Sequence, residues 1–108
     1  MKLSISVLAI LALVLAIPAR PQDGSTSITI VNHLVPPGKQ NAVPLTLYVN
    51  GNYGCGPVTD DGGSCEAFVN PGQYTFEVKA PGYPTRTKEK YMPHGERFTW
   101  TISAKAAH

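Results

Sequence analysis

Hydrophobic and polar residues alternate most clearly between Pro71 and Tyr83, where the sequence reads P-G-Q-Y-T-F-E-V-K-A-P-G-Y. Tyr74, Phe76 and Val78 share one side of this segment, polar residues occupy the other, and a Pro-Gly pair bounds each end. A period of two residues over this length is typical of a half-buried β-strand. We therefore expect a strand here, and we expect the rest of the chain to be organised around it.

Similar segments recur along the chain, with turn-forming residues between them. We expect further strands at residues 25–31, 43–49, 52–58, 65–69, 85–92 and 96–103, of which 52–58 is short and glycine-rich. Asn50-Gly51 is typical of a type I′ hairpin turn, because both central residues of that turn need positive φ. Short strands with turns between them and no helical pattern predict an all-β fold. We favour a single small antiparallel β-sandwich of six to seven strands with Greek-key-like connections, and a Greek-key barrel is the alternative.

The inward faces of these strands should form the hydrophobic core. The expected core residues are Ile28, Ile30, Leu45, Leu47, Val49, Tyr74, Phe76, Val78, Phe98, Trp100 and Ile102. The segment 85–92 is different, because Arg86, Lys88 and Lys90 share one of its faces. This pattern favours an edge strand, where lysines hinder edge-to-edge aggregation.

Residues 1–19 have the composition of a secretory signal peptide. Lys2 precedes an apolar run from Leu3 to Ile17, and the small residues Ala16 and Ala19 suit a cleavage position. This run is shorter than the roughly 20 residues that a membrane-spanning helix needs. We expect cleavage of 1–19, a flexible lead-in at 20–24, a β-sandwich domain at 25–103 and a tail at 104–108. The mature protein would then be secreted or periplasmic and would have no membrane span.

The two cysteines of the chain, Cys55 and Cys65, are expected to form a disulfide. Extracytoplasmic compartments are oxidising, and a small domain with a limited core gains from a covalent link. A loop of this length is worth roughly 3 kcal/mol in the chain-entropy model. Two sulfurs alone make half a zinc site, and no histidine lies at ligand spacing from them.

Composition and motifs argue against several classes of function. The formal net charge of +2 is too small for a protein that binds nucleic acid along its surface. We interpret His33, His94 and His108 as solvated histidines, and Asp60-Asp61 as a hairpin tip, since the EF-hand spacing for calcium is absent. The serines lack the G-x-S-x-G elbow of a hydrolase. We therefore expect no enzyme activity, no catalytic or metal-binding residues and no cofactor.

Three segments together resemble a known family. They are L-Y-V-N-G at 47–51 with Gly54 and Pro57 after it, N-P-G-Q-Y-T-F-E-V at 70–78, and A-P-G-Y at 80–83 with Gly95-Glu96 before the closing strand. In order and spacing, residues 42–103 resemble the PEGA-type domain, a small extracytoplasmic β-sandwich of bacterial envelope proteins, and are similar to carboxypeptidase-regulatory-like and transthyretin-like sandwiches. The literal P-E-G-A is replaced by N-A-V-P at 41–44, and the cysteine pair is not part of the family pattern. The resemblance implies a non-enzymatic interaction module without catalytic residues.

Two groups of residues are candidates for a partner surface. The first group is basic and consists of Arg86, Lys88 and Lys90, extended by Lys79 if its strand is adjacent. These residues could contact an acidic glycan, a phospholipid head group or an acidic protein. The alternative is that they only protect a sheet edge. Tyrosines near turns can stack on sugars or anchor a protein, although outer-face packing between strands is the alternative for Tyr48. The tyrosines of this group are Tyr48, Tyr53 and Tyr83.

These observations favour a binding or accessory module that acts at the cell envelope by recognising a protein or a glycan, through the candidate residues or an open sheet edge. The alternative is a small secreted inhibitor or effector that uses the disulfide-clamped loop at 56–64. The partner is unknown from sequence, and we expect a monomer or a weak oligomer.

Overall fold

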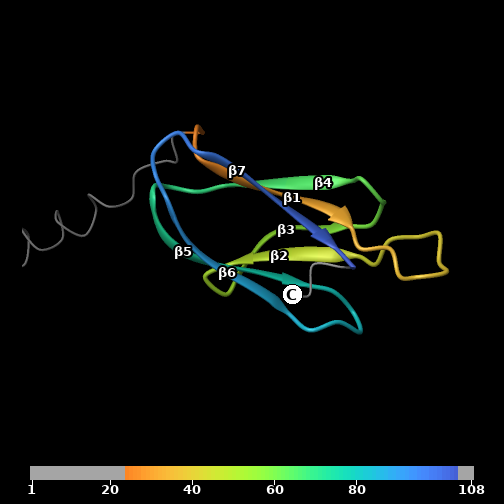
Figure 1. The fold of residues 1–108 in the computed structure, drawn as a ribbon. Coiled ribbons are helices and arrows are strands. Elements are labelled where there is room, and N and C mark those ends of the chain that lie inside the picture. Colours follow the sequence, from red (N-terminus) through yellow and green to blue (C-terminus); the bar gives the residue numbers. More distant parts are fainter. Residues whose placement is uncertain (1–23, 105–108) are drawn as a thin grey trace, which may run out of the picture.

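The computed structural model describes residues 24–104, so the expected signal peptide and most of the lead-in and the tail lie outside the described residues. This part of the chain forms strands and no helix (Figure 1). The strands are β1 (Ser27–His33), β2 (Leu45–Val49), β3 (Asn52–Val58), β4 (Ser64–Phe68), β5 (Gly72–Lys79), β6 (Arg86–Met92) and β7 (Arg97–Ser103).

The strands form two sheets that pack as a β-sandwich, which confirms the predicted fold class. One sheet has the order β4-β1-β7 and the other has the order β3-β2-β5-β6. The alternating segment between Pro71 and Tyr83 contains β5, which lies inside the larger sheet between β2 and β6. One pairing departs from the antiparallel expectation, because β1 and β7, from opposite ends of the domain, run parallel.

The hairpin between β2 and β3 has the predicted turn. Asn50 and Gly51 have φ values of 50° and 82°, and Val49 lies opposite Asn52. Asn50 also holds the neighbouring strand, since its Oδ1 accepts a hydrogen bond from the Thr75 backbone N–H at 2.9 Å. The local sequence therefore determines both the turn type and the place where β3 begins.

Replacing Gly51 with alanine should lower the free energy of unfolding by about 1–2 kcal/mol, since an L-residue is disfavoured at this φ. No other atom lies within 4 Å of the position that a Cβ would occupy, so the cost is conformational and not steric. Gly51→Asn should cost less, because asparagine tolerates left-handed φ. Urea denaturation of the two variants measures the difference, and an equal loss in both would contradict this explanation.

The core lies between the sheets and is built largely from the predicted residues. Those that are buried as expected are Ile28, Ile30, Leu45, Leu47, Phe76, Val78 and Ile102. Four others, Val49, Tyr74, Phe98 and Trp100, are only partly buried and pack against this cluster. Leu34, Val58 and Met92 belong to the same buried cluster, although their segments looked like a loop, a weak strand and a polar strand.

Asn32 is a fully buried polar residue just beyond the predicted end of the first strand. β1 continues through it to His33, and its side chain points inward with Ile28 and Ile30. Its Nδ2 donates hydrogen bonds to the backbone oxygens of Val43 and Val58, both at 2.8 Å. Its Oδ1 accepts one from the Leu34 N–H at 2.9 Å. Asn32 thus joins the end of β1 to the segments that precede β2 and end β3.

Candidate functional site

The two lateral sides of the sandwich are closed in different ways. On one side β3 and β4, which are edge strands of different sheets, are joined by the Cys55–Cys65 disulfide with a Cα–Cα distance of 6.0 Å. The predicted disulfide is therefore confirmed, and it links two sheets. On the other side lie the edge strands β6 and β7 (Figure 1), and no strand pairing joins them within residues 24–104. We call this second side the open side.

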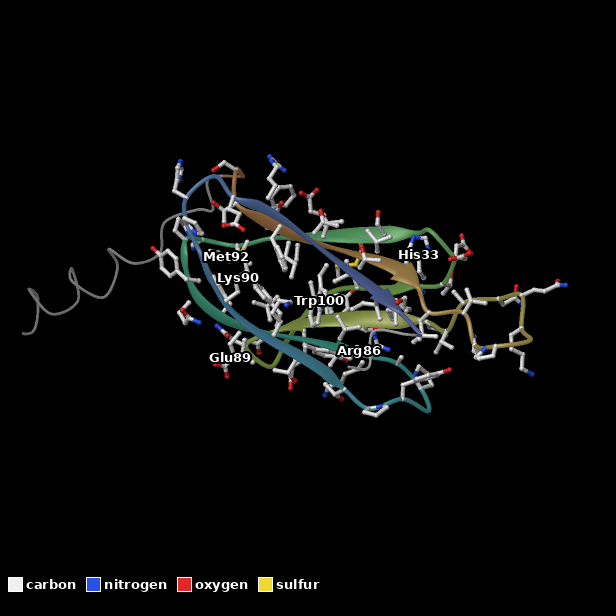
Figure 2. The ribbon with its side chains drawn as sticks, viewed as in Figure 1. His33, Arg86, Glu89, Lys90, Met92 and Trp100 are labelled. Atoms are coloured by element: carbon white, nitrogen blue, oxygen red, sulfur yellow. A yellow bond between two sulfur atoms is a disulfide. The ribbon has the colours of Figure 1, made fainter. Side chains whose placement is uncertain are left out.

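The basic residues of β6 point inward at this open side. Arg86, Lys88 and Lys90 lie opposite Val78, Phe76 and Tyr74 of β5, so they share the face of the sheet that covers the core. All three are half-buried, whereas the residues between them are exposed. In Figure 2, Lys90 and Trp100 lie between the two sheets and Glu89 lies on the outside. β6 is an edge strand as predicted, but its cations do not form an outer stripe.

The inward cations lie over aromatic rings of β7. Lys88 Nζ is 5.5 Å from the centre of the Trp100 ring and 5.9 Å from that of Phe98, and Lys90 Nζ is 5.0 Å from that of Phe98. Long basic side chains can cover apolar surface with their methylene groups while the charge remains near water, and an ammonium over a ring is attracted by the π electrons. This arrangement explains why Phe98 and Trp100 are only partly buried.

Lys79 does not extend the basic group, and that prediction is wrong. Its strand is indeed the neighbour of β6, but the period of two places Lys79 on the outer face, where its Nζ lies 4.8 Å from the centre of the Tyr48 ring. Tyr48 and Tyr53 are cross-strand neighbours there, with ring centres 6.5 Å apart at 84°. The cross-strand packing that we considered for Tyr48 is therefore present, and these two tyrosines lie away from the open side.

A groove of about 510 Å³ opens between β6 and β7, next to the turn that precedes β6. Its lining residues are Tyr83, Pro84, Thr85, Arg86, Thr87, Lys88, Trp100 and Ala104. The structure thus brings three of the six candidate residues, Tyr83, Arg86 and Lys88, into one site, with Lys90 further along the same face. Trp100 belongs to the site as well, but its alternating strand pattern indicated only a core residue.

The groove carries unbalanced positive charge. Lys90 forms an ion pair with Glu96 at 2.9 Å, but within the described residues neither Arg86 nor Lys88 has an ion-pair partner. Arg86 Nη1 is also enclosed by the protein without a hydrogen-bond partner. Two cationic side chains in one groove, without an ion-pair partner among the described residues, favour an anionic group from outside them.

The loop proposed as an alternative interaction element is fastened to β1. Gly62 donates a backbone hydrogen bond to Asn32 at 2.6 Å, and Asn32 donates one to Gly63 at 2.8 Å. The carboxylate of Asp61 contacts His33 Nδ1 at 2.8 Å, so this histidine is exposed but has a partner. Within the described part of the chain, no cluster of histidine, cysteine and acidic residues could hold a metal ion.

The comparisons with known proteins leave function to be argued from the residues themselves. No family model matches this sequence, and no similar curated protein was found. The PEGA-type resemblance therefore stays a prediction. Among residues 24–104 there is no helix with the length and hydrophobicity that spanning a bilayer requires.

Proposed function

We propose that the protein is a secreted or periplasmic, non-enzymatic recognition module that binds an acidic partner at the cell envelope through its open side. The observation that carries this proposal is the unpaired positive charge of Arg86 and Lys88 in a groove lined by aromatic residues. The disulfide supports an oxidising compartment. Complementary charge then supports fast and selective association with a negatively charged surface.

Edge protection accounts for part of this arrangement, because inward-pointing charged residues on an edge strand hinder edge-to-edge pairing. It does not by itself account for a groove in which two of these cations have no ion-pair partner among the described residues. At positions 86, 88 and 90, apolar side chains would instead bury against Phe98 and Trp100 and close the sandwich. The chain forgoes that hydrophobic stabilisation, which is typical of a site kept for recognition.

Lys88→Glu should weaken binding to an acidic polymer by at least about tenfold, because it places a negative charge among the groups that would face the ligand. The probes are immobilised polygalacturonate, immobilised polyglutamate and anionic vesicles, measured by biolayer interferometry at low and at physiological ionic strength. Lys39→Glu is the matched control, since it makes the same charge change at an exposed loop residue that does not line the groove. Its binding should stay close to that of the wild type.

Two results would contradict the proposal. Equal losses in Lys88→Glu and Lys39→Glu would mean that net charge, and not the open side, governs binding. Loss of binding on Asp60→Ala with full binding by Lys88→Glu would place the contact in the 56–64 loop and favour the inhibitor or effector function. Circular dichroism and thermal melts of each variant establish that the fold is retained.

A further inference from the structure

Arg86 is the feature of the groove that the fold itself does not explain. Its guanidinium reaches between the sheets, where Nη1 is shielded from water and has no hydrogen-bond partner. An unsatisfied charged donor at such a place destabilises the fold, because the lost hydration is not replaced. Arg86 itself lines the groove, where a ligand oxygen would meet the parts of its side chain that are not shielded.

The nearby carboxylates of the described chain cannot serve as that acceptor. Glu77 and Glu89 of β5 and β6 lie on the outer face of the sheet, on the opposite side from Arg86. Glu96 contacts Lys90 at 2.9 Å. The groove is therefore lined by Arg86, which has no carboxylate partner among the described residues, and by Lys88, whose ammonium lies over Trp100.

The rest of the lining suits a sugar ring. Tyr83 and Trp100 provide aromatic surface beside the two cations. The volume of about 510 Å³ falls in the usual range of small-molecule sites, roughly 300–1,000 Å³. Aromatic side chains offer an apolar surface to the C–H face of a pyranose.

We propose that this groove binds a uronic acid unit of an acidic polysaccharide, with the carboxylate at the Arg86 guanidinium and the sugar ring against the aromatic lining. This inference rests on the proposed function and specifies its ligand. A planar guanidinium matches a carboxylate through two parallel hydrogen bonds, which an ammonium cannot reproduce. An acidic peptide fits less well, because a peptide added as a strand would pair with the free backbone edge of β6, outside the side-chain-lined groove.

Trp100 allows a direct test, since it is the only tryptophan in the chain and lines the groove. The oxidised, secreted protein is titrated with trigalacturonate and, in parallel, with its fully methyl-esterified form, which keeps the sugar rings and removes the charge. Trigalacturonate should change the Trp100 emission in a saturable manner. The ester should bind at least about tenfold more weakly, because the charge-assisted hydrogen bonds to Arg86 are absent.

Variants then separate the guanidinium from its charge. Arg86→Lys keeps the charge but loses the two-pronged contact, and it should bind trigalacturonate about tenfold more weakly than wild type. Lys39→Gln should bind like wild type. The comparison of acid with ester uses only the wild-type protein, so it remains decisive even if Arg86→Lys fails to fold.

The outcomes distinguish this inference from the broader proposal. If trigalacturonate leaves the Trp100 emission unchanged while acidic polymers still bind in a Lys88-dependent way, the uronate site is wrong and the recognition function stands. A response to polyglutamate but not to trigalacturonate would overturn the uronate site in favour of an acidic protein ligand. A response to dextran sulfate alone would mean that the groove binds sulfate groups. Equal affinity for acid and ester, or full affinity in Arg86→Lys, would show that the Arg86 guanidinium does not bind the ligand carboxylate.

Discussion

Replacing Asn32 with aspartate should lower the free energy of unfolding by about 4 kcal/mol. The substitution keeps size and shape, but it removes both donors of Nδ2 and leaves the carbonyl oxygens of Val43 and Val58 without this partner. Each lost buried hydrogen bond costs about 1–3 kcal/mol, and a carboxylate facing two carbonyl oxygens adds the cost of an unpaired buried charge. Asn32 is 0% exposed, so water cannot compensate.

Asn52→Asp is the matched control, because it makes the same chemical change at an exposed position of β3. It should change the free energy of unfolding by no more than about 0.5 kcal/mol. Urea denaturation followed by Trp100 fluorescence measures both variants in the oxidised protein. Similar midpoints for the two variants would show that the Asn32 side chain does not hold β1 to its neighbours.

Removing the disulfide with Cys55→Ala and Cys65→Ala together should cost about 3 kcal/mol. The link closes a loop with a sequence separation of 10 residues, and its loss restores the corresponding entropy to the unfolded chain. The expected loss is a large part of the stability of a domain this small. Because this disulfide closes the side formed by β3 and β4, the double variant would have a non-covalent boundary on both sides.

Wild-type protein in reductant should unfold at the same urea concentration as the double variant, and reductant should not shift the variant. This comparison separates loss of the covalent link from any change in packing caused by alanine. A double variant that matches the oxidised wild type would mean that packing alone joins the two sheets on that side.

The local sequence was a good guide wherever one strand or one turn was concerned. The predicted bounds of β3, residues 52–58, agree with the structure, and the Asn50-Gly51 turn has the expected positive φ angles. β1 ends two residues later than predicted, at His33. The reason is Asn32, an inward-facing polar residue whose partners come from residues 43 and 58, so no local pattern marks it as buried.

The candidate site could be predicted only in part. The residues Tyr83, Arg86 and Lys88 were recognised from composition and from their position near a turn or along one face of a strand. The sequence did not predict whether the basic face of this strand would point inward or outward. Alternation separates the two faces of a strand, but it does not say which face packs against the other sheet. The contribution of Trp100 was also missed, since it depends on the meeting of β6 with β7 across the sandwich.

From its sequence alone this chain is recognisable as a β domain of six to seven strands with one disulfide, because alternation and turn chemistry act between near neighbours and two cysteines permit one pairing. Strand order, the parallel pairing of β1 with β7 and the difference between a sealed and an open side became known only from the folded molecule. These features depend on contacts between residues far apart in the chain. For the same reason, three basic residues that look like an ordinary protected edge face inward in the folded protein, where Arg86 and Lys88 line a groove with Tyr83 and Trp100.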